Sequence, residues 1–507
     1  MSKFGQSFDT APERGGGGAM NLTDRTRAVL GQAIATYHGT ADAARLAAVR
    51  DRLAAPLRVA VAGRVKAGKS TLLNALVGER LAPTDAGECT RIVTWYRDGH
   101  AYQVQAALKK GPARPLRFTR DDGAIDIDLD GLNAADIDRL TVTWPSRALR
   151  TVTLIDTPGI GSLSEQTARH TWELLAPDDE ETPADAVVYL LRHLHPGDVE
   201  FLRAFHDTEV SRPSPVNAIG VLSRADEIGA GRPDSMASAR RIATRLGTDG
   251  NVRRLVQSVV PVAGLLAETA VTLTETEVSQ LRKIAALPVK QAEELLLSAD
   301  RFASAMPELG LTSLEREALL ARFGLYGVRL TSTLLRREVA TTATALAKEL
   351  ADRSGLTQLK EIIGSLFYDR ADVLKSRSAL LAVAETVRER PRPGSEAVAA
   401  AVEEIMASAH PFNELRVLSS LRAGWITGKP DAVADLERLI GGAGSALSDR
   451  LHLAPDAAAA EQAASAREAL ARWQRRAENP LTSYEMSVAA RVAVRSCEGM
   501  LARLEQR

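Results

Sequence analysis

The hydrophobic positions along the chain change their period twice. Over residues 21–53 they recur every three or four residues, as on one face of an amphipathic helix, and Pro56 ends this pattern. Over residues 57–365 short apolar runs alternate with helical segments, the order found in a parallel sheet with crossover helices. Over residues 366–507 the period is helical again. The pattern therefore predicts an α/β domain between two helical segments.

Five apolar runs are the clearest strands, and each is followed by loop residues and a helical pattern. This order predicts a mostly parallel, doubly wound sheet. A polar stretch at Thr119–Asp138 is expected to be an insertion on the surface. The five predicted strands are Arg58–Ala62, Thr151–Ile155, Ala186–Leu191, Ala218–Leu222 and Ser258–Val262.

Four segments follow from these patterns. Residues 1–20, with four consecutive glycines, are expected to be a disordered lead-in. Residues 21–56 are predicted to form one N-terminal helix, residues 57–365 the α/β domain, and residues 366–507 an all-helical domain. Because amphipathic helices need partners, we expect the first helix and the last ones to build one bundle from both chain ends. In the last helix, Thr482 and Glu485 have the spacing of a capping box.

The composition of the chain excludes some classes of partner and location. The chain has 64 basic and 64 acidic residues, and this zero net charge argues against a nucleic-acid partner. Cys89 and Cys497 are the only cysteines, which favours a reducing compartment. The sequence has no run of 18 apolar residues and no secretory signal, so we expect a cytoplasmic protein whose membrane contact is peripheral.

The segment Gly63–Ser70 fits the pattern G-x-x-x-x-G-K-[ST] of a phosphate-binding loop. It follows a predicted strand and opens a predicted helix, the context in which backbone N–H groups can cradle phosphates. Lys69 is expected to reach the β- and γ-phosphates, and the Ser70 hydroxyl to ligate Mg²⁺. The predicted nucleotide contacts here are Gly63, Arg64, Val65, Lys66, Ala67, Gly68, Lys69, Ser70 and Thr71.

A second motif, D-T-P-G, begins at Asp156, at the end of a predicted strand. We expect Asp156 to hold Mg²⁺ through a bound water and the Gly159 N–H to bond the γ-phosphate. The polar loop between the two motifs can supply a threonine that ligates Mg²⁺ and senses the γ-phosphate. Thr84, Thr90 and Thr94 are candidates, and Thr90, at the junction of loop and strand, is preferred.

The choice of base depends on the four residues Ser223–Asp226, which follow another predicted strand. One carboxylate, that of Asp226, can accept hydrogen bonds from both N1–H and the exocyclic amine of guanine, a pair that adenine lacks. Arg224 can stack on the purine, and the Ala263 backbone amide is expected to meet guanine O6. Ser and Arg depart from the usual N/T-K-x-D. The motif predicts GTP as substrate; an ATP-driven enzyme, in which Asp226 is incidental, is the alternative.

Two further positions bear on catalysis. Ile160 follows D-T-P-G, where other GTPases carry a water-orienting Gln, and Ile cannot do this. Charge that develops on the leaving phosphate needs a cation. Lys66, inside the phosphate loop, is a candidate for this cation; K⁺ in that role, and a merely solvated Lys66, are the alternatives.

Together these motifs resemble those of a bacterial dynamin-like protein of the actinobacterial isoniazid-inducible type. The stretches Arg322–Arg329 and Arg495–Gly499 are also similar to that group. The resemblance implies Mg²⁺-dependent GTP hydrolysis and dimerisation through the GTPase domains. It further implies a helical neck and trunk that bind and remodel lipid at the cytoplasmic face of the plasma membrane, acting alone or beside a second dynamin-like protein.

The loop Gly424–Lys429 is the predicted lipid contact, because it combines an amphipathic Trp with a basic flank. Trp425, Ile426 and Lys429 are its candidate residues, and packing of Trp425 inside the bundle is the alternative. The competing function is a switch GTPase whose helical domain docks a protein partner without remodelling a membrane.

Overall fold

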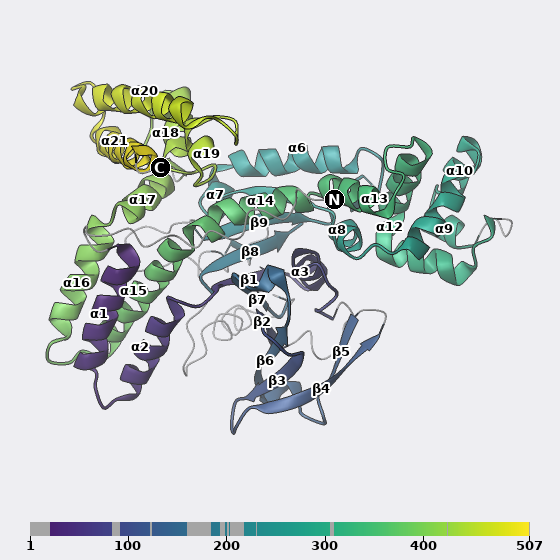
Figure 1. The fold of residues 1–507 in the computed structure, drawn as a ribbon, viewed down its shortest axis with the longest axis horizontal. Helices are drawn as coiled ribbons and strands as arrows, with labels where there is room; N and C mark the ends of the chain where they lie inside the picture. Colours follow the sequence, from purple (N-terminus) through teal and green to yellow (C-terminus); the bar gives the residue numbers. More distant parts are fainter. Residues whose placement is uncertain are drawn as a thin grey trace.

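The centre of the molecule is a ten-stranded sheet with the order β10-β9-β8-β1-β7-β2-β6-β3-β4-β5 (Figure 1). The computed structural model describes residues 21–83, 92–121, 124–159, 184–192, 198–199, 202, 217–229, 231–304, 309–422 and 424–505. The strands are β1 (Leu57–Gly63), β2 (Val93–Asp98), β3 (Gln103–Leu108), β4 (Arg114–Asp121), β5 (Ala124–Asp128), β6 (Ile137–Trp144), β7 (Val152–Asp156), β8 (Ala186–Leu191), β9 (Ala218–Ser223) and β10 (Val259–Val262).

One half of the sheet is parallel and contains all five strands predicted above. β10, β9, β8, β1 and β7 run in the same direction, and every residue of β8 and β9 is buried. Such strands need cover on both faces, which explains why they read as continuous apolar runs. The predicted α/β class with a doubly wound sheet is confirmed.

The other half of the sheet is largely antiparallel. β2 pairs antiparallel with β7, β3 with β6 and β4, and β4 with β5, whereas β2 and β6 are parallel. The stretch Thr119–Asp138, expected to be a surface insertion, belongs to this half. Ile125 and Ile127 on β5 are buried, because alternate residues of a strand face the same side. Most described residues of the stretch are exposed, as expected, but the alternation of polar residues with these isoleucines belongs to an edge strand that the sequence analysis did not predict.

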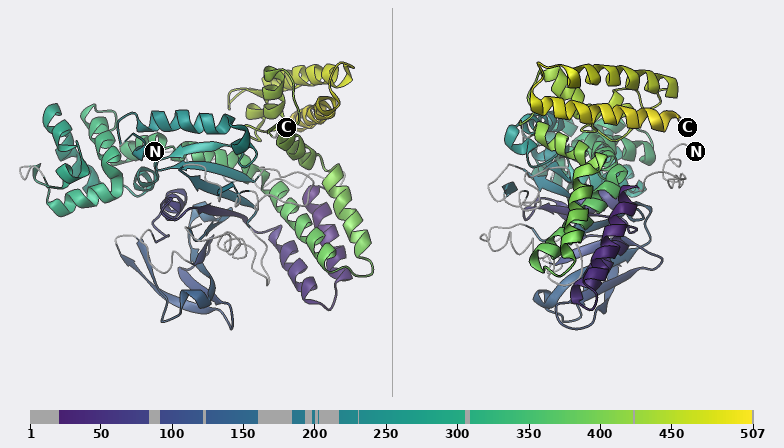
Figure 2. Two further views of the ribbon diagram at one scale, coloured as in Figure 1. Left: turned by 180° about the vertical axis from the view of Figure 1, so that it is seen from behind. Right: turned by 90° about the vertical axis from the view of Figure 1, so that its left-hand side faces the viewer.

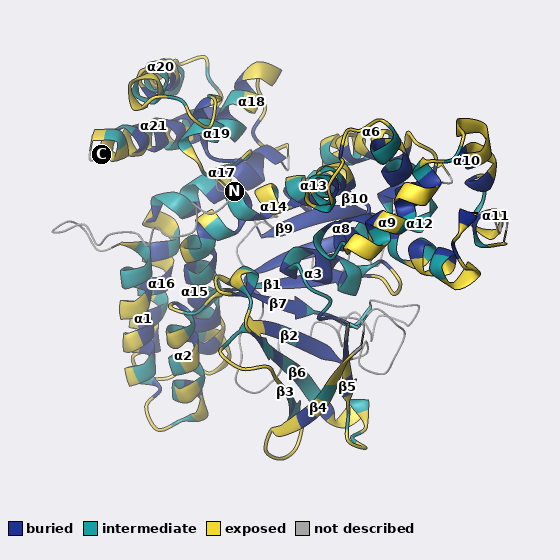
Figure 3. Ribbon diagram, turned by 45° about the vertical axis from the view of Figure 1, so that its right-hand side comes forward, coloured by how far each residue is buried: buried dark blue, intermediate teal, exposed yellow. Residues whose placement is uncertain are grey.

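Helices cover both faces of the parallel half. On β1, Ala60 and Ala62 belong to one hydrophobic core and Val59 and Val61 to the other. The first core contains residues of α6 to α13, and the second contains residues of α3 and α14; Figure 3 shows the buried strands between them. These helices are α3 (Lys69–Val77), α6 (Ser235–Thr248), α7 (Gly250–Arg253), α8 (Gly264–Val271), α9 (Glu275–Ala285), α10 (Val289–Leu295), α11 (Ala299–Ser304), α12 (Ser313–Arg336), α13 (Ala343–Ser354) and α14 (Leu356–Leu366).

A helical bundle built from both chain ends stands beside the sheet, as predicted. Residues of the N-terminal helices share a core with residues of α15, α16 and the start of α17, and these helices lie side by side in both views of Figure 2. The single helix predicted over residues 21–56 is in fact two helices, because the chain turns at Gly39 with a φ of 79°. The helices are α1 (Leu22–Thr36), α2 (Ala41–Arg52), α15 (Ala371–Glu389), α16 (Ser395–Ser408) and α17 (His410–Arg422).

The remaining helices form a second bundle with its own core around Trp473 and Cys497. The C-terminal region is therefore two bundles that share α17. At the start of the last helix, Ser483 accepts a hydrogen bond from the Met486 N–H at 3.3 Å, whereas the Thr482 hydroxyl donates to the Arg476 carbonyl. Ser483 is thus the cap in place of Thr482. The helices are α18 (Pro430–Leu439), α19 (Leu447–Leu451), α20 (Ala459–Glu478) and α21 (Tyr484–Glu505).

Two of the predicted domain boundaries fall at ends of elements. β1 begins at Leu57, directly after the predicted N-terminal segment, and α14 ends at Leu366, at the predicted start of the helical domain. Within the described ranges, no helix is both long and apolar enough to cross a membrane.

Candidate functional site

The phosphate loop joins β1 to α3 at the carboxyl end of the central parallel strands. β1 ends at Gly63 and α3 begins at Lys69, so the predicted order of strand, loop and helix is confirmed. Gly63 has a φ of 146°, and a Cβ there would lie 2.6 Å from the Leu190 carbonyl oxygen. Gly68 has a φ of 91° and precedes the helix directly. Both positions need glycine, because a side chain would be strained at each and would also strike β8 at the first.

Lys69 turns its side chain back into this loop. Its Nζ donates to the carbonyls of Gly63 at 3.3 Å and Arg64 at 3.2 Å, and the residue is only 9% exposed. Burial lowers the pKa of Lys69, while the nearby Asp156 carboxylate opposes that shift. A buried ammonium whose protein partners are carbonyl oxygens is placed to bind a strong anion, as predicted for the β- and γ-phosphates.

Ser70 and Asp156 meet beside Lys69. The Ser70 hydroxyl donates to Asp156 Oδ2 at 2.9 Å. Asp156 Oδ1 is buried and has no hydrogen-bond partner among the residues that the structure describes. Burial raises the pKa of Asp156 to about 6, against the opposing effects of the Lys69 charge and the Ser70 hydrogen bond. An unsatisfied carboxylate oxygen next to a serine hydroxyl at a phosphate loop fits a divalent cation, held directly or through water.

The D-T-P-G motif packs against the phosphate loop. The Thr157 hydroxyl donates to the Val61 carbonyl on β1 at 3.0 Å. At Gly159 a Cβ would lie 2.7 Å from Val65 Cα and 2.8 Å from Val65 N. The two predicted motifs, far apart in the sequence, are therefore in backbone contact, and only glycine permits this approach.

Of the three threonine candidates for the Mg²⁺ ligand, the structure describes only Thr94. Thr84 and Thr90, as well as Ile160, lie outside the described residues. Thr94 is on β2, 5% exposed and opposite Asp156 in the ladder, and its hydroxyl donates to the Ile92 carbonyl. Thr94 is therefore part of the sheet core, and Thr90 stays a prediction.

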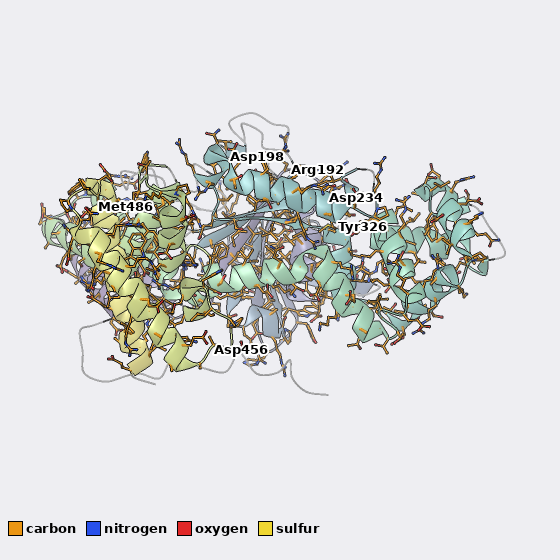
Figure 4. All side chains as sticks on the ribbon, turned by 90° about the horizontal axis from the view of Figure 1, so that it is seen from above. Arg192, Asp198, Asp234, Tyr326, Asp456 and Met486 are labelled. Atoms are coloured by element: carbon orange, nitrogen blue, oxygen red, sulfur yellow. The ribbon has the colours of Figure 1, made fainter. Side chains whose placement is uncertain are left out.

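The base loop is tied to the phosphate loop by Arg224. Arg224 has left-handed φ and ψ of 52° and 42°, and its Nη2 donates to the Lys66 carbonyl at 3.0 Å. Its Nη1 donates to Glu227 Oε1 at 2.8 Å, and Glu227 also pairs with Arg192, which is labelled in Figure 4. Because guanidinium can serve two partners at once, Arg suits this place better than Lys. Sequence reasoning missed Glu227, although an acid one residue after Asp226 was a usable signal.

Lys66, whose carbonyl bonds to Arg224, has its backbone and its side chain in different surroundings. The Lys66 carbonyl accepts the bond from Arg224, while its exposed side chain is carried by a backbone with a φ of 62°. The side chain is thus free of packing constraints that would fix it away from a nucleotide. Lys66 and K⁺ remain alternative catalytic cations, and hydrolysis measured in sodium against potassium buffers, for the parent and for Lys66→Ala, distinguishes them.

Asp226 lies under a kink of α12. It is 8% exposed, and burial raises the pKa of its carboxyl. Gly324 interrupts α12 with a φ of 63° and a ψ of 168°, and a Cβ there would lie 3.7 Å from Asp226 Oδ2. The stretch Arg322–Arg329 therefore forms a wall behind the carboxylate that is predicted to read the base. Ser223, at the end of β9, donates its hydroxyl to the Leu191 carbonyl.

Ala263 differs from its predicted role. Its N–H donates to the Ser354 carbonyl at 2.9 Å, so this amide is already used within the protein. The expected contact with guanine O6 is corrected accordingly. The next residue, Gly264, begins α8 and faces Thr71, with 3.8 Å between a Cβ at Gly264 and Thr71 Cγ2.

In the loop predicted to contact lipid, two of the three candidate side chains are exposed and one is buried. Trp425 is 43% exposed and Lys429 is exposed, as a lipid contact requires. Ile426 is only 7% exposed and belongs to the core of the second bundle. The prediction for Ile426 was wrong, because this side chain fills the space beneath the loop.

Asp226→Asn is expected to reduce the preference for GTP over ATP by about ten- to a hundredfold, because one charge-assisted hydrogen bond is lost. Competition of the two nucleotides for the protein measures this ratio. Asp234→Asn, at an exposed aspartate before α6, is the matched control and should change nothing. Equal binding of GTP and ATP by the parent protein would contradict the assignment.

The chain is similar in sequence to several known proteins. The model of the Dynamin family matches residues 59–196. The isoniazid-induced protein IniC of Mycobacterium tuberculosis is 42% identical over 496 residues, which cover 96% of this chain and 100% of IniC. IniA of the same organism is 29% identical over 263 residues, 50% of this chain and 38% of IniA. A solved structure of an oligomerised bacterial dynamin pair is 12% identical and covers 96% of this chain and 76% of its own, with a TM-score of 0.28. The identity to IniC over nearly the whole chain, with the match to the family model, shows that this chain belongs to the dynamin family, as a bacterial dynamin-like GTPase related to IniC.

Proposed function

We propose that this GTPase couples GTP hydrolysis to binding and remodelling of lipid at the cytoplasmic face of the plasma membrane. The observation that carries the proposal is a group of exposed apolar side chains on the second bundle. Trp425 is 43% exposed, Leu481 92%, Tyr484 79% and Val488 40%. We call these four residues the apolar end.

The members of the apolar end come from two segments of the second bundle. Trp425 lies between α17 and α18, and the other three lie in the α20–α21 turn and the first turns of α21. These segments touch, since a Cβ at Gly428 would lie 2.9 Å from Met486 Cε. In Figure 4, Met486 lies on the side of the molecule away from the lobe of α9 to α12.

The chemistry of the apolar end suits a bilayer surface. Trp and Tyr are the residues that favour the interface between lipid and water, because one part of each ring is apolar and another part is polar. Lys429 adds an exposed positive charge for anionic headgroups. Leu481 can insert its whole side chain, which contributes about 1.5–3 kcal/mol when it leaves water.

Further parts of the proposal concern the nucleotide site. We expect Mg²⁺ to be the divalent cation at Ser70 and Asp156, with Thr90 as a further ligand. We also expect a nucleotide-dependent homodimer through the GTPase domains, or pairing with a second dynamin-like protein. Val65, 57% exposed on the outer side of the phosphate loop, offers an apolar contact for such a partner.

Leu481→Ser combined with Tyr484→Ser should lower the binding of the full chain to anionic liposomes at least about tenfold, because two apolar side chains can no longer leave water. Sedimentation with and without GTP measures this. Leu314→Ser is the matched control, since Leu314 is 76% exposed on α12, outside the second bundle. GTP hydrolysis without liposomes should be equal in all three proteins.

Two outcomes would contradict the proposal. A double variant that sediments like the parent would show that the apolar end is not the lipid contact. A parent protein that ignores liposomes in every nucleotide state would favour the switch GTPase, whose helical bundles dock a protein.

A further inference from the structure

A buried polar cluster joins the phosphate-loop helix to the chain that leaves it. Asn74, in the middle of α3, is fully buried, and its Oδ1 accepts a hydrogen bond from the Ala82 N–H at 2.7 Å. Its Nδ2 donates to the Ala82 carbonyl at 3.0 Å and to Glu268 Oε1 on α8 at 2.9 Å. One amide side chain thus satisfies both polar groups of Ala82 and holds Glu268 as well.

Glu268 is an unusual residue to find in this core. It is 5% exposed, and burial raises the pKa of its carboxyl, while the Asn74 hydrogen bond and the Arg80 charge lower it. Arg80 Nε lies 3.7 Å from Glu268 Oε1. A buried carboxyl costs stability unless it is bonded, so its presence calls for a role beyond packing.

The cluster lies on elements that lead directly to the phosphate loop. α3 begins with Lys69 and Ser70, which lie five and four residues before Asn74. Ala82 begins the segment in which the switch threonine is predicted. α8, which carries Glu268, begins at Gly264 beside Thr71, in the first turn of the helix that follows the phosphate loop.

The same cluster is linked to the base-reading wall. The Thr269 hydroxyl, next to Glu268, donates to the Arg322 carbonyl. Arg322 lies two residues before the kink at Gly324, and its Nε donates to Glu277 Oε1 at 2.8 Å. Hydrogen bonds, together with the chain between the neighbours Glu268 and Thr269 on α8, therefore connect the stretch behind Asp226 to Ala82.

We propose that Asn74 and Glu268 are positioning residues for GTP hydrolysis. They fix the path of the chain at Ala82 relative to Lys69 and Ser70, and they do so without touching the nucleotide. A misplacement of about 1 Å in a catalytic arrangement can cost on the order of a hundredfold in rate. Because the phosphate and base contacts are unchanged, loss of the cluster lowers kcat and leaves nucleotide affinity nearly intact.

Asn74→Asp tests the proposal. The new carboxylate faces Glu268 and the Ala82 carbonyl, both of which accepted hydrogen bonds from the amide. We expect kcat to fall on the order of a hundredfold, with the Kd of GTP changed by less than about threefold. Stopped-flow binding and steady-state hydrolysis of the full chain give the two values.

The combination of Asn74→Asp with Glu268→Gln is the decisive measurement. The glutamine amide can donate to the aspartate, so the repulsion between the two carboxylates disappears while the Ala82 N–H keeps its acceptor; only the Ala82 carbonyl stays without its donor. Most of the lost kcat should return, whereas Glu268→Gln alone should stay within a few-fold of the parent. This rescue is a coupling between two residues that a general loss of stability would not produce.

If Asn74 only stabilised the fold, its substitution would act like that of any other buried asparagine. Asn217→Asp is the matched control, because Asn217 is also buried (7% exposed) and precedes β9 outside the cluster. If both aspartate variants melt earlier and lose kcat in equal measure, or if the double variant is no faster than Asn74→Asp, the proposal is overturned.

A second variant keeps the test open should Asn74→Asp fail to fold. Glu268→Ala leaves both bonds between Asn74 and Ala82 in place and removes only the link to α8. It should lower kcat by about tenfold at unchanged GTP affinity. A parental rate in this variant would exclude Glu268 from the positioning role.

Discussion

Lys69→Ala is expected to lower GTP hydrolysis by on the order of a thousandfold, close to complete loss. The Lys69 ammonium is buried in the phosphate loop against the carbonyls of Gly63 and Arg64. Among the described residues no other lysine or arginine side chain bonds to these two carbonyls, so no second buried ammonium takes its place in the loop. GTP binding should weaken as well, because the charge attracts the ground state and the transition state alike.

The nucleotide-free variant should remain folded. Burial lowers the pKa of Lys69, which means that its charged form is held at a cost, and alanine removes that cost. Thermal unfolding without nucleotide should therefore be unchanged or slightly higher. Lys110→Ala, at an exposed lysine between β3 and β4, is the control for the loss of one positive charge. Near-parental turnover of Lys69→Ala would end the assignment of this loop to phosphate binding.

Gly159→Ala is expected to weaken GTP binding and hydrolysis by on the order of a hundredfold each. Its Cβ would lie 2.6 Å from Val65 Cγ2, 2.7 Å from Val65 Cα and 2.8 Å from Val65 N. Backbone atoms cannot turn aside as a side chain does, so either the phosphate loop or the D-T-P-G segment must move. Both carry predicted phosphate contacts, and displacement of either disrupts the site.

Gly247→Ala is the matched control for this substitution. Gly247 lies in α6, and a Cβ there would have no neighbour within 4 Å. Alanine in the last turn of this helix should stabilise the fold by less than about 1 kcal/mol and leave hydrolysis unchanged. Parental kinetics in Gly159→Ala would mean that the close contact with Val65 is not kept when GTP is bound.

The elements that the sequence predicted well are those whose cause is local. The loop Gly63–Ser70 has its form because consecutive residues provide a strand, two glycines with positive φ and a helix start. The buried parallel strands were visible as apolar runs, because cover on both faces leaves no polar positions. The loop motif and the apolar runs can both be recognised without knowing which other parts of the chain pack against them.

Errors arose where a single pattern suits two structures. The apolar period of residues 21–53 continues through the turn at Gly39, because α1 and α2 pack on the same bundle. At the lipid loop, Trp425 and Ile426 are adjacent and both apolar, yet only the isoleucine is buried. The direction of a side chain in a loop depends on the surrounding helices, and the sequence does not contain it in readable form.

By itself the sequence determined the strand, loop and helix of the phosphate-loop motif, the five parallel strands, and membership in a family of GTPases. Only the tertiary structure decided which distant groups meet. Arg224 bonds to the Lys66 carbonyl across 158 residues, Asn74 bonds to Glu268 across 194, and Ser354 takes the Ala263 amide that had been assigned to guanine. Local motifs repeat because their geometry depends on a few consecutive dihedral angles. Long-range hydrogen bonds depend on how whole helices pack against one another. A short pattern of residues does not predict this packing.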